Sequence, residues 1–365
     1  YLDMVTSTKN NPNENYAREI LQLFSIGLNK MNLDGTLQLD VEGNPLPTYD
    51  QAVVTGFAKV FTGWTFEAQP SPGVVNYIAP MRLVANNHDI GTKQLLNGAV
   101  QPAAQTGVQD LNAALDNIFN HANVGPFIAG HLIRSLVTSN PAPAYVSRVA
   151  SVFNDNGSGT RGDLGAVVRA LLLDPEARGD FKSDPNYGHL KEPALFVPSI
   201  LRAFNARAAS GAVGSTSDGY LNPQTSPMDQ DVFRPPTVFS YYPPDYLAPG
   251  TTDVLGPEFG IFSATTALRR ANFVNTIVYA TIAVSTNAPN GTSIDQTGLQ
   301  ALAGNPTALV AELDRVLLHG TMSTAMRDSI VTAVNAVPAG TNQMRDRARA
   351  ALYLVATSSQ YQVQR

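Results

Sequence analysis

The sequence predicts an all-α fold, a single large multi-helix domain over residues 1–365 with long ordered loops and at most a short β-hairpin. Apolar residues recur at i, i+3, i+4 and i+7 in segments along the whole chain, and this spacing is typical of amphipathic helices. Many of the joints between these segments are short, as in helical bundles. No repeat of fixed period and no disordered linker divides the chain, so one domain is expected.

The clearest helix is predicted near the start of the chain, over 11–28 (NPNENYAREILQLFSIGL). Asn11 fits the N-cap, Pro12 fits the first helical position, and Glu14 fits the third, where it can return a hydrogen bond to the cap. Behind them the apolar residues keep helical spacing, which predicts one broad buried stripe made of Tyr16, Ile20, Leu21, Leu23, Phe24, Gly27 and Leu28.

Alternation of apolar and polar residues over 36–46, around a Gly-Asn turn, predicts the short hairpin or an extended excursion. A second helix is predicted over 49–62, with Thr48 and Gln51 as its capping box. Two regions without a sustained period are predicted to be ordered loops, 65–108 and 206–256.

The other predicted helices share clear helical periodicity, and a glycine-rich loop precedes the fourth of them. Short joints between the first four indicate a bundle. They are predicted over 110–121, 125–137, 142–153, 163–173, 189–205, 262–284, 299–303, 306–318, 323–337 and 343–357.

Composition excludes several classes of function. The net charge is −5 and only 15% of the residues are charged, so a nucleic-acid-binding surface of clustered Lys and Arg is not expected. The chain has no Cys, which excludes disulfides and thiolate chemistry, and it has no run of about 18 apolar residues that would span a membrane. A polar, weakly charged composition with 28 Gly and 25 Pro supports an exported protein.

The polar face of the first helix is a candidate catalytic site. Glu14, Asn15, Arg18 and Glu19 crowd little more than one turn, and an Arg beside carboxylates keeps them ionised and can bind an anion. The structural alternative is a helix cap with surface ion pairs, since a Glu–Arg pair at i,i+4 is common and contributes only about 0.2–0.5 kcal/mol.

The segment HDIGTK, 88–93, is the second candidate. His88 and Asp89 can act as acid, base or metal ligand, and Lys93 can hold an anionic group. A hydrogen-bonded clip within the loop is the structural alternative. Because the sequence lacks HExxH and a carboxylate-rich calcium loop, we predict no metal and no cofactor, and keep a metal site of His88, Asp89 and a glutamate only as a third alternative.

His121 and Asn123 are candidate binding residues in the joint between two helices, where they can also satisfy orphan backbone groups. Arg134 follows on the next helix, with His131 on the same stretch. His189 and Glu192 open a later helix, where a helix-start pair is expected.

Aromatic residues give the remaining binding candidates. Trp64 is the only tryptophan and stands at a predicted helix end, where it can anchor the core or stack on a ligand. Tyr241 and Tyr242 lie in the proline-rich segment SYYPPDY, which predicts either a binding lip or a loop packed over the helices.

Eight segments, in this order, resemble domain-of-unknown-function family 1800, and together they extend over nearly the whole chain. They are NENYAREILQLFSIGL, FTGW, HDIGTK, NHANVGPFIAGHLIRSLV, DLGAVVRALLLDPEAR, FRPPTVFSYYPPDY, GPEFGIF and YLVATSSQYQVQR. The chain departs from the family's pattern at Ala122, where Pro is usual, and at His131, where a basic residue is more typical. These departures weaken any transfer of a role to His121, Asn123 or His131.

The resemblance implies a bacterial protein, often exported, with no assigned reaction. Members of the family carry a further helical region before NENYARE, so residues 1–365 are expected to be the C-terminal major part of a longer precursor. The resemblance also implies a partner from domain-of-unknown-function family 1501, whose members resemble sulfatases and alkaline phosphatases. An extracytoplasmic location follows from the same likeness, whether periplasmic, cell-surface or secreted.

Two hypotheses for function follow. The first is a binding or assembly component of unassigned activity at or beyond the cell envelope. The second is a hydrolytic enzyme acting with a sulfatase- or phosphatase-like partner, with Glu14 or Glu19 as base, His88 as acid or base, and Arg18 and Lys93 holding an anion. The second hypothesis requires these groups to meet around an open cavity.

Overall fold

The structure is a computed structural model that describes residues 3–68, 71–179, 184, 186–211 and 215–365. The chain forms two compact units: unit 1 comprises Tyr1–Leu136 and Pro141–Gly179, and unit 2 comprises Val137–Asn140 and Asp180–Arg365. The single domain over 1–365 stays a prediction. Parts of both predicted loops, at 69–70 and 212–214, lie outside the described residues.

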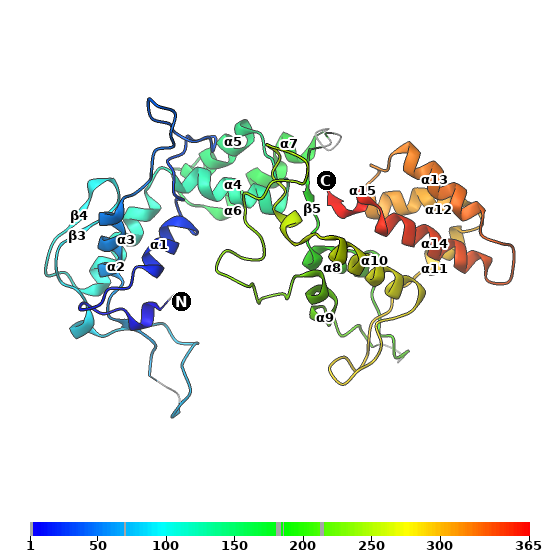
Figure 1. The fold of residues 1–365 in the computed structure, drawn as a ribbon, viewed down its shortest axis with the longest axis horizontal. Helices are drawn as coiled ribbons and strands as arrows, with labels where there is room; N and C mark the ends of the chain where they lie inside the picture. Colours follow the sequence, from blue (N-terminus) through cyan, green and yellow to red (C-terminus); the bar gives the residue numbers. More distant parts are fainter. Residues whose placement is uncertain (1–2, 69–70, 180–183, 185, 212–214) are drawn as a thin grey trace. The chain divides into compact units, whose positions relative to one another are not determined.

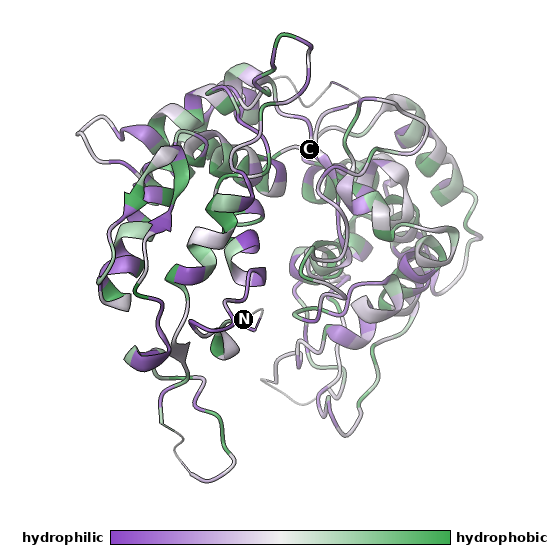
Figure 2. Ribbon diagram, turned by 60° about the vertical axis from the view of Figure 1, so that its left-hand side comes forward, coloured by the Kyte–Doolittle hydropathy of each residue, from purple (hydrophilic) through white to green (hydrophobic). Residues whose placement is uncertain are grey.

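The all-α prediction is confirmed, since the chain is 48% helical and its strands form three short two-stranded antiparallel sheets within the described part. Figure 1 shows this predominance of helix. In Figure 2 the helices carry both hydrophobic and hydrophilic bands, as expected for helices that bury one face. No helix in the described part of the chain has the length and apolar character needed to cross a membrane.

Unit 1 is built from helices that pack in sequence order, with α4 against α5 and α5 against α6. Two small sheets lie in its loop regions, where Trp64 pairs with Leu83 and Lys93 with Gln101. Its helices and strands are η1 (Met4–Thr6), α1 (Asn15–Gln22), α2 (Gln51–Val60), β1 (Trp64–Thr65), β2 (Arg82–Leu83), η2 (Ala85–Asn87), β3 (Lys93–Gln94), η3 (Leu96–Gly98), β4 (Val100–Gln101), α3 (Gly107–Phe119), α4 (Val124–Leu136), α5 (Pro143–Asn154), α6 (Leu164–Leu173) and α7 (Pro175–Arg178).

Helix α1 is shorter than predicted, and the predicted cap at Asn11 is wrong. The helix begins after Glu14, because the Asn13 side chain accepts the Asn15 N–H and holds the chain in a turn before it. It ends at Gln22, beyond which the backbone N–H groups of Ile26 and Gly27 both donate to the Leu21 carbonyl.

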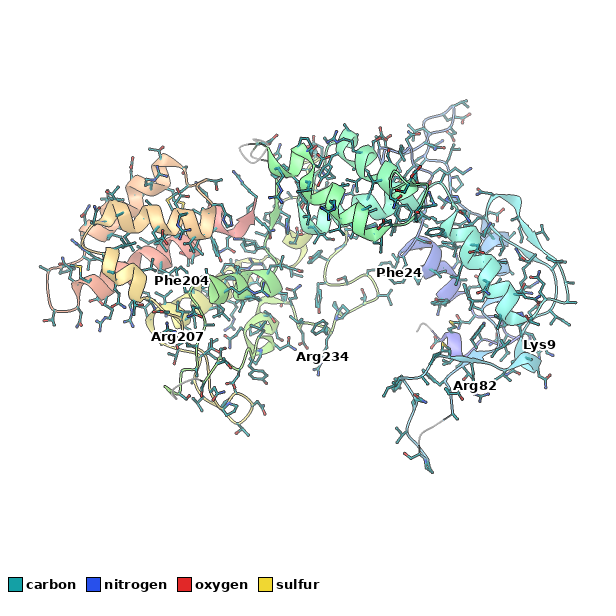
Figure 3. All side chains as sticks on the ribbon, turned by 180° about the vertical axis from the view of Figure 1, so that it is seen from behind. Lys9, Phe24, Arg82, Phe204, Arg207 and Arg234 are labelled. Atoms are coloured by element: carbon teal, nitrogen blue, oxygen red, sulfur yellow. The ribbon has the colours of Figure 1, made fainter. Side chains whose placement is uncertain are left out.

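The early end of α1 changes which side chains are buried. Phe24 and Leu28 are 51% and 52% exposed instead of lying on a buried stripe, and Figure 3 labels Phe24 just after α1. The buried positions are Ala17, Leu21 and Ile26.

The capping box predicted for the second helix is also wrong. Asp50 caps α2 by accepting the Val53 N–H, while the Thr48 hydroxyl donates to the Gly27 carbonyl. Gln51 is therefore free to point its side chain at α1. The hairpin predicted over 36–46 is an extended excursion held by isolated bridges, among them Met31 with Leu37 and Leu39 with Pro45.

Unit 2 holds a large hydrophobic core between α8, α10 and the helices from α11 to α15. One two-stranded sheet joins distant parts of the sequence in it, with His189 paired to Gln364. Its elements are β5 (His189–Leu190), α8 (Pro193–Ala203), α9 (Asn222–Thr225), η5 (Ser226–Met228), η6 (Pro257–Ile261), α10 (Ala264–Tyr279), α11 (Thr297–Leu302), α12 (Pro306–Leu313), the π-helix η7 (Asp314–Leu318), α13 (Thr324–Asn335), α14 (Gln343–Thr357), α15 (Ser359–Gln362) and β6 (Val363–Gln364).

Two predicted helices of unit 2 have different bounds in the structure. The helix expected from residue 189 begins at Pro193, because the backbone of His189 and Leu190 is engaged in the sheet. The helix expected to reach residue 284 ends at Tyr279, since Ile282 pairs with Thr292 instead. The helix predicted over 343–357 is confirmed as α14 at both ends.

Candidate functional site

The polar face of α1 forms a hydrogen-bonded clamp with α2. Glu14 accepts hydrogen bonds from Arg18 (2.9 Å), Gln51 (2.8 Å) and Thr55 (3.2 Å), and Arg18 also donates to Gln51 at 2.7 Å. The hydrogen bond from Gln51, followed by those from Thr55 and Arg18, lowers the pKa of Glu14 against a smaller opposing effect of burial. Glu14 and Arg18 thus hold two helices together at a partly exposed position.

The other two candidates on α1 do not join this clamp. Asn15 is exposed, and the Glu19 side chain has one buried oxygen, Oε2, without a hydrogen-bond partner among the described residues.

The HDIGTK segment contributes to a buried ionic cluster completed by Asp110 of α3. Asp110 Oδ2 lies 2.7 Å from Lys93 Nζ and 2.9 Å from His88 Nε2. His88 Nδ1 lies 3.0 Å from the Thr62 carbonyl oxygen, which only accepts, so Nδ1 carries a hydrogen. The side chains of His88, Lys93 and Asp110 are at most 2% exposed, so this cluster is sealed from solvent.

Asp89 supports the cluster from its edge. Its Oδ1 accepts the Gly91 N–H at 2.7 Å and lies 3.9 Å from Lys93 Nζ, while Lys93 also donates to the Gly91 carbonyl. The loop is therefore clipped by its own side chains, as the structural alternative predicts. Across the described residues, no three His, Asp or Glu side chains are arranged to hold a metal ion.

The structure places the two predicted halves of the hydrolytic site in separate groups. The hydrogen bonds of Glu14 and Arg18 go to α2, whereas those of His88 and Lys93 go to α3 and to their own loop. Sequence reasoning missed Asp110, although one signal was present: it stands at i−4 and i−8 from Ala114 and Ile118, on the buried face of its helix.

Asn123 fixes the turn after α1 from the joint before α4. Its side chain donates to the carbonyls of Ile26 (2.9 Å) and Asn29 (2.8 Å) and accepts the Met31 N–H (3.0 Å). His121 Nδ1 accepts the Asn123 N–H at 3.1 Å. Burial, with smaller contributions from two nearby cations, lowers the pKa of His121, so its ring is neutral near neutral pH. Both residues serve backbone groups.

The aromatic candidates are held inside their own units. Trp64 lies in β1 and is partly buried, with Nε1 lacking a hydrogen-bond partner among the described residues. In unit 2, Tyr241 accepts the Arg234 N–H, and Tyr242 donates to Glu192 Oε2 at 2.8 Å. The tyrosine loop is therefore tied to α8 by Tyr242.

Arg134 and His131 line an open pocket on one face of α4. The pocket has a volume of about 180 Å³ and is formed by that face, the turn at Asp34 and the start of α5. Apolar and polar groups share its walls, and its lining consists of Met31, Asp34, Gly35, Thr36, Pro126, Phe127, Gly130, His131, Arg134, Pro141, Pro143 and Val146.

Arg134 is the unusual residue of this pocket. It makes no hydrogen bond or ion pair with any described residue, and its Nε is buried without an acceptor. Burial lowers the pKa of Arg134, although a guanidinium stays charged at any physiological pH. His131 packs on Phe127 with ring centroids 4.3 Å apart, and burial followed by the charge of Arg134 lowers its pKa.

Gly130 keeps the floor of the pocket open. It lies inside α4, and a Cβ added there would meet nothing within 4 Å. A helix-interior glycine costs about 1 kcal/mol relative to alanine, and no packing contact explains that cost at Gly130. Gly125 on the same helix differs, because its Cβ would come within 2.8 Å of the Asn154 side chain.

The protein is mostly helical. Many of its buried polar residues lie in the joints and on the helix faces of unit 1 and around α8 in unit 2. The chain belongs to the family described as Protein of unknown function (DUF1800), whose model matches residues 1–363. The family prediction is thereby confirmed. No curated protein and no solved structure matches the chain.

Proposed function

We propose that the protein is a binding component whose ligand site is the Arg134 pocket of unit 1, and that the ligand carries a carboxylate on a small apolar or planar body. The observation that supports this most directly is the unpaired, partly buried guanidinium of Arg134. Nε lies below the solvent-accessible surface, so an acceptor in the pocket would meet the two terminal NH2 groups, which make no hydrogen bond to any described residue.

The chemistry of the walls indicates the rest of the ligand. Arg presents a planar fork that matches a carboxylate through two parallel hydrogen bonds. Phe127 and three prolines supply flat apolar surface beside it. The pocket volume of about 180 Å³ exceeds the roughly 150 Å³ of a cavity that holds benzene, so it admits a carboxylate with a ring-sized body.

Asp34 also lines the pocket and repels a second negative charge. Hydrogen bonds from the Thr36 hydroxyl and backbone lower the pKa of Asp34, so it stays ionised near neutral pH. A ligand with one carboxylate is therefore favoured over a dianion.

The proposed setting is a bacterial cell envelope or the space beyond it, with a protein of domain-of-unknown-function family 1501 as the partner. The polar, weakly charged and cysteine-free composition supports this setting. A hydrolytic role has less support, because the acid, base and cationic groups that it needs belong to two separate clusters, one of them sealed.

Benzoate and benzamide test the proposed site, because they share shape and differ in charge. We expect ligand-observed NMR or calorimetry to detect benzoate binding at least tenfold tighter than benzamide, since a charge-assisted hydrogen bond contributes about 1.5–3 kcal/mol. Arg134→Gln should abolish the difference. Gly130→Met should block both ligands, because its side chain fills the pocket, and the circular dichroism spectrum should stay unchanged. The control is Lys9→Gln, which removes an exposed positive charge at a position distant in sequence from Arg134 and should leave binding of both ligands unchanged.

Equal binding of benzoate and benzamide would contradict the role of Arg134. Undiminished benzoate binding by a folded Gly130→Met variant would place the site elsewhere.

A further inference from the structure

Unit 2 buries an amine that has no counter-ion among the described residues. Lys191 follows β5 and is 9% exposed, and its ammonium group lies 3.6 Å from the centre of the Tyr361 ring. No described residue gives Nζ a hydrogen-bond acceptor or a carboxylate within ion-pair distance. Burial alone lowers the pKa of Lys191 to about 8, with no acidic group raising it.

The cavity beside Lys191 is also lined by Arg365, and no Asp or Glu of the described residues lines it. It has a volume of about 40 Å³ and is formed by Lys191, Leu317, Leu318, His319, Thr321, Gln360, Val363, Gln364 and Arg365. The nearest carboxylate of η7, Asp314, is already bonded to Arg327 (2.9 Å) and the Met322 N–H (3.0 Å). Asp314 therefore does not compensate the positive charge of Lys191.

We propose that this cavity is a binding site for a small tetrahedral oxyanion, with Lys191 as the buried contact and His319 as a contact at the rim. The size fits, because one water requires about 10–15 Å³ and the cavity thus holds roughly three waters or one partly exposed oxyanion. His319 is exposed and follows the last residue of η7, where the chain turns and the His319 backbone has a positive φ of 55°.

An oxyanion in this cavity is also compatible with the cation–π contact between Lys191 and Tyr361. The Tyr361 ring attracts the ammonium from one side, so the N–H donors that do not face the ring are left to be met by water or by a ligand. Glutamine side chains at 360 and 364 supply neutral donors or acceptors at the same cavity, although Gln360 is bonded to Ser323. The site is therefore expected to bind a ligand that is small and negatively charged, and the ligand needs no large apolar part.

Competitive acetylation followed by mass spectrometry tests this site in the 365-residue chain. Inorganic phosphate and sulfate are the probes, and chloride at equal ionic strength is the control. We expect saturating phosphate or sulfate to slow acetylation of Lys191 about tenfold, because the bound oxyanion engages the amine. Acetylation of Lys9, an exposed lysine labelled in Figure 3, should not change.

Calorimetry on variants gives the second readout. Lys191→Gln should weaken phosphate binding at least tenfold, and His319→Gln, at an exposed position that leaves the core untouched, should weaken it by about threefold to tenfold. Equal slowing of both lysines, or slowing of Lys191 by chloride as well, would overturn the proposal. Unchanged phosphate affinity in a folded His319→Gln variant would overturn the rim contact. Stronger protection by phosphate than by sulfate would support a phosphate site, and the reverse order a sulfate site.

Discussion

Replacing Asp110 by Asn should destabilise unit 1 far more than any change at the α1 clamp. Asp110 is fully buried with its Oδ2 2.7 Å from Lys93 Nζ, which is itself 1% exposed. At an effective dielectric constant of about 20, two unit charges at that distance attract by roughly 6 kcal/mol. Removing this charge leaves the buried ammonium with only the more distant carboxylate of Asp89, 3.9 Å away, so we expect a loss of about 3–5 kcal/mol in the free energy of unfolding.

Trp64 supplies the assay. It is the only tryptophan of the chain and lies in β1 of unit 1, so its fluorescence during urea unfolding reports on that unit. Glu14→Gln is the matched control, because it neutralises a partly exposed ion pair in the same unit and should cost less than about 1 kcal/mol. Adding Lys93→Met to Asp110→Asn removes the buried ammonium and should recover at least half of the lost free energy of unfolding.

A loss below about 1 kcal/mol for Asp110→Asn would refute this reasoning. It would mean that Lys93 reaches solvent or another anion when its partner is neutral. Failure of the double variant to regain stability would show that His88, and not Lys93, depends most on Asp110.

Two further predictions concern the same unit. Gly130→Ala should stabilise it by about 1 kcal/mol, whereas Gly125→Ala should destabilise it because the new methyl meets Asn154; urea midpoints compare the two. Burial lowers the folded pKa of His121 and His131, so the unfolded chain takes up protons first and stability falls as the pH drops below about 6.5. Replacing both with Gln should flatten this pH dependence, and an unchanged slope would assign it to other groups.

Periodicity predicted helices well where packing and local preference agree. The stripe of α14 runs without Gly or Pro, and its predicted bounds are those observed. Helix α1 shows why ends are harder to predict. Asn11 has the chemistry of a cap, but the Asn13 side chain forms its own turn two residues later, and tertiary contacts of Asn123 then fix the chain after the helix. Such competition between neighbouring polar residues leaves no trace in spacing alone.

The candidate sites show a similar division. His88 and Lys93 are conspicuous because they stand in one short polar segment, but their partner Asp110 belongs to a helix that begins later in the chain. Arg270 is a parallel case in unit 2, since it is 2% exposed in α10 and donates to the Lys191 carbonyl and to Gln362. Asp110 and Arg270 are charged residues on otherwise apolar helix faces. A charged residue at such a position is the signal by which the sequence can reveal a buried ionic or hydrogen-bonded group.

The path of the chain between the two units has a consequence for synthesis on the ribosome. Val137–Asn140 belongs to unit 2 although unit 1 resumes at Pro141. Asn140 exchanges hydrogen bonds with the backbone of Leu255 (2.9 and 2.8 Å), and Thr138 accepts the Gly188 N–H. Those partners are translated later, so the hydrogen bonds of this short segment can form only after α5, α6 and α7 have been synthesised. A truncation after Gly179 would leave the segment permanently without them.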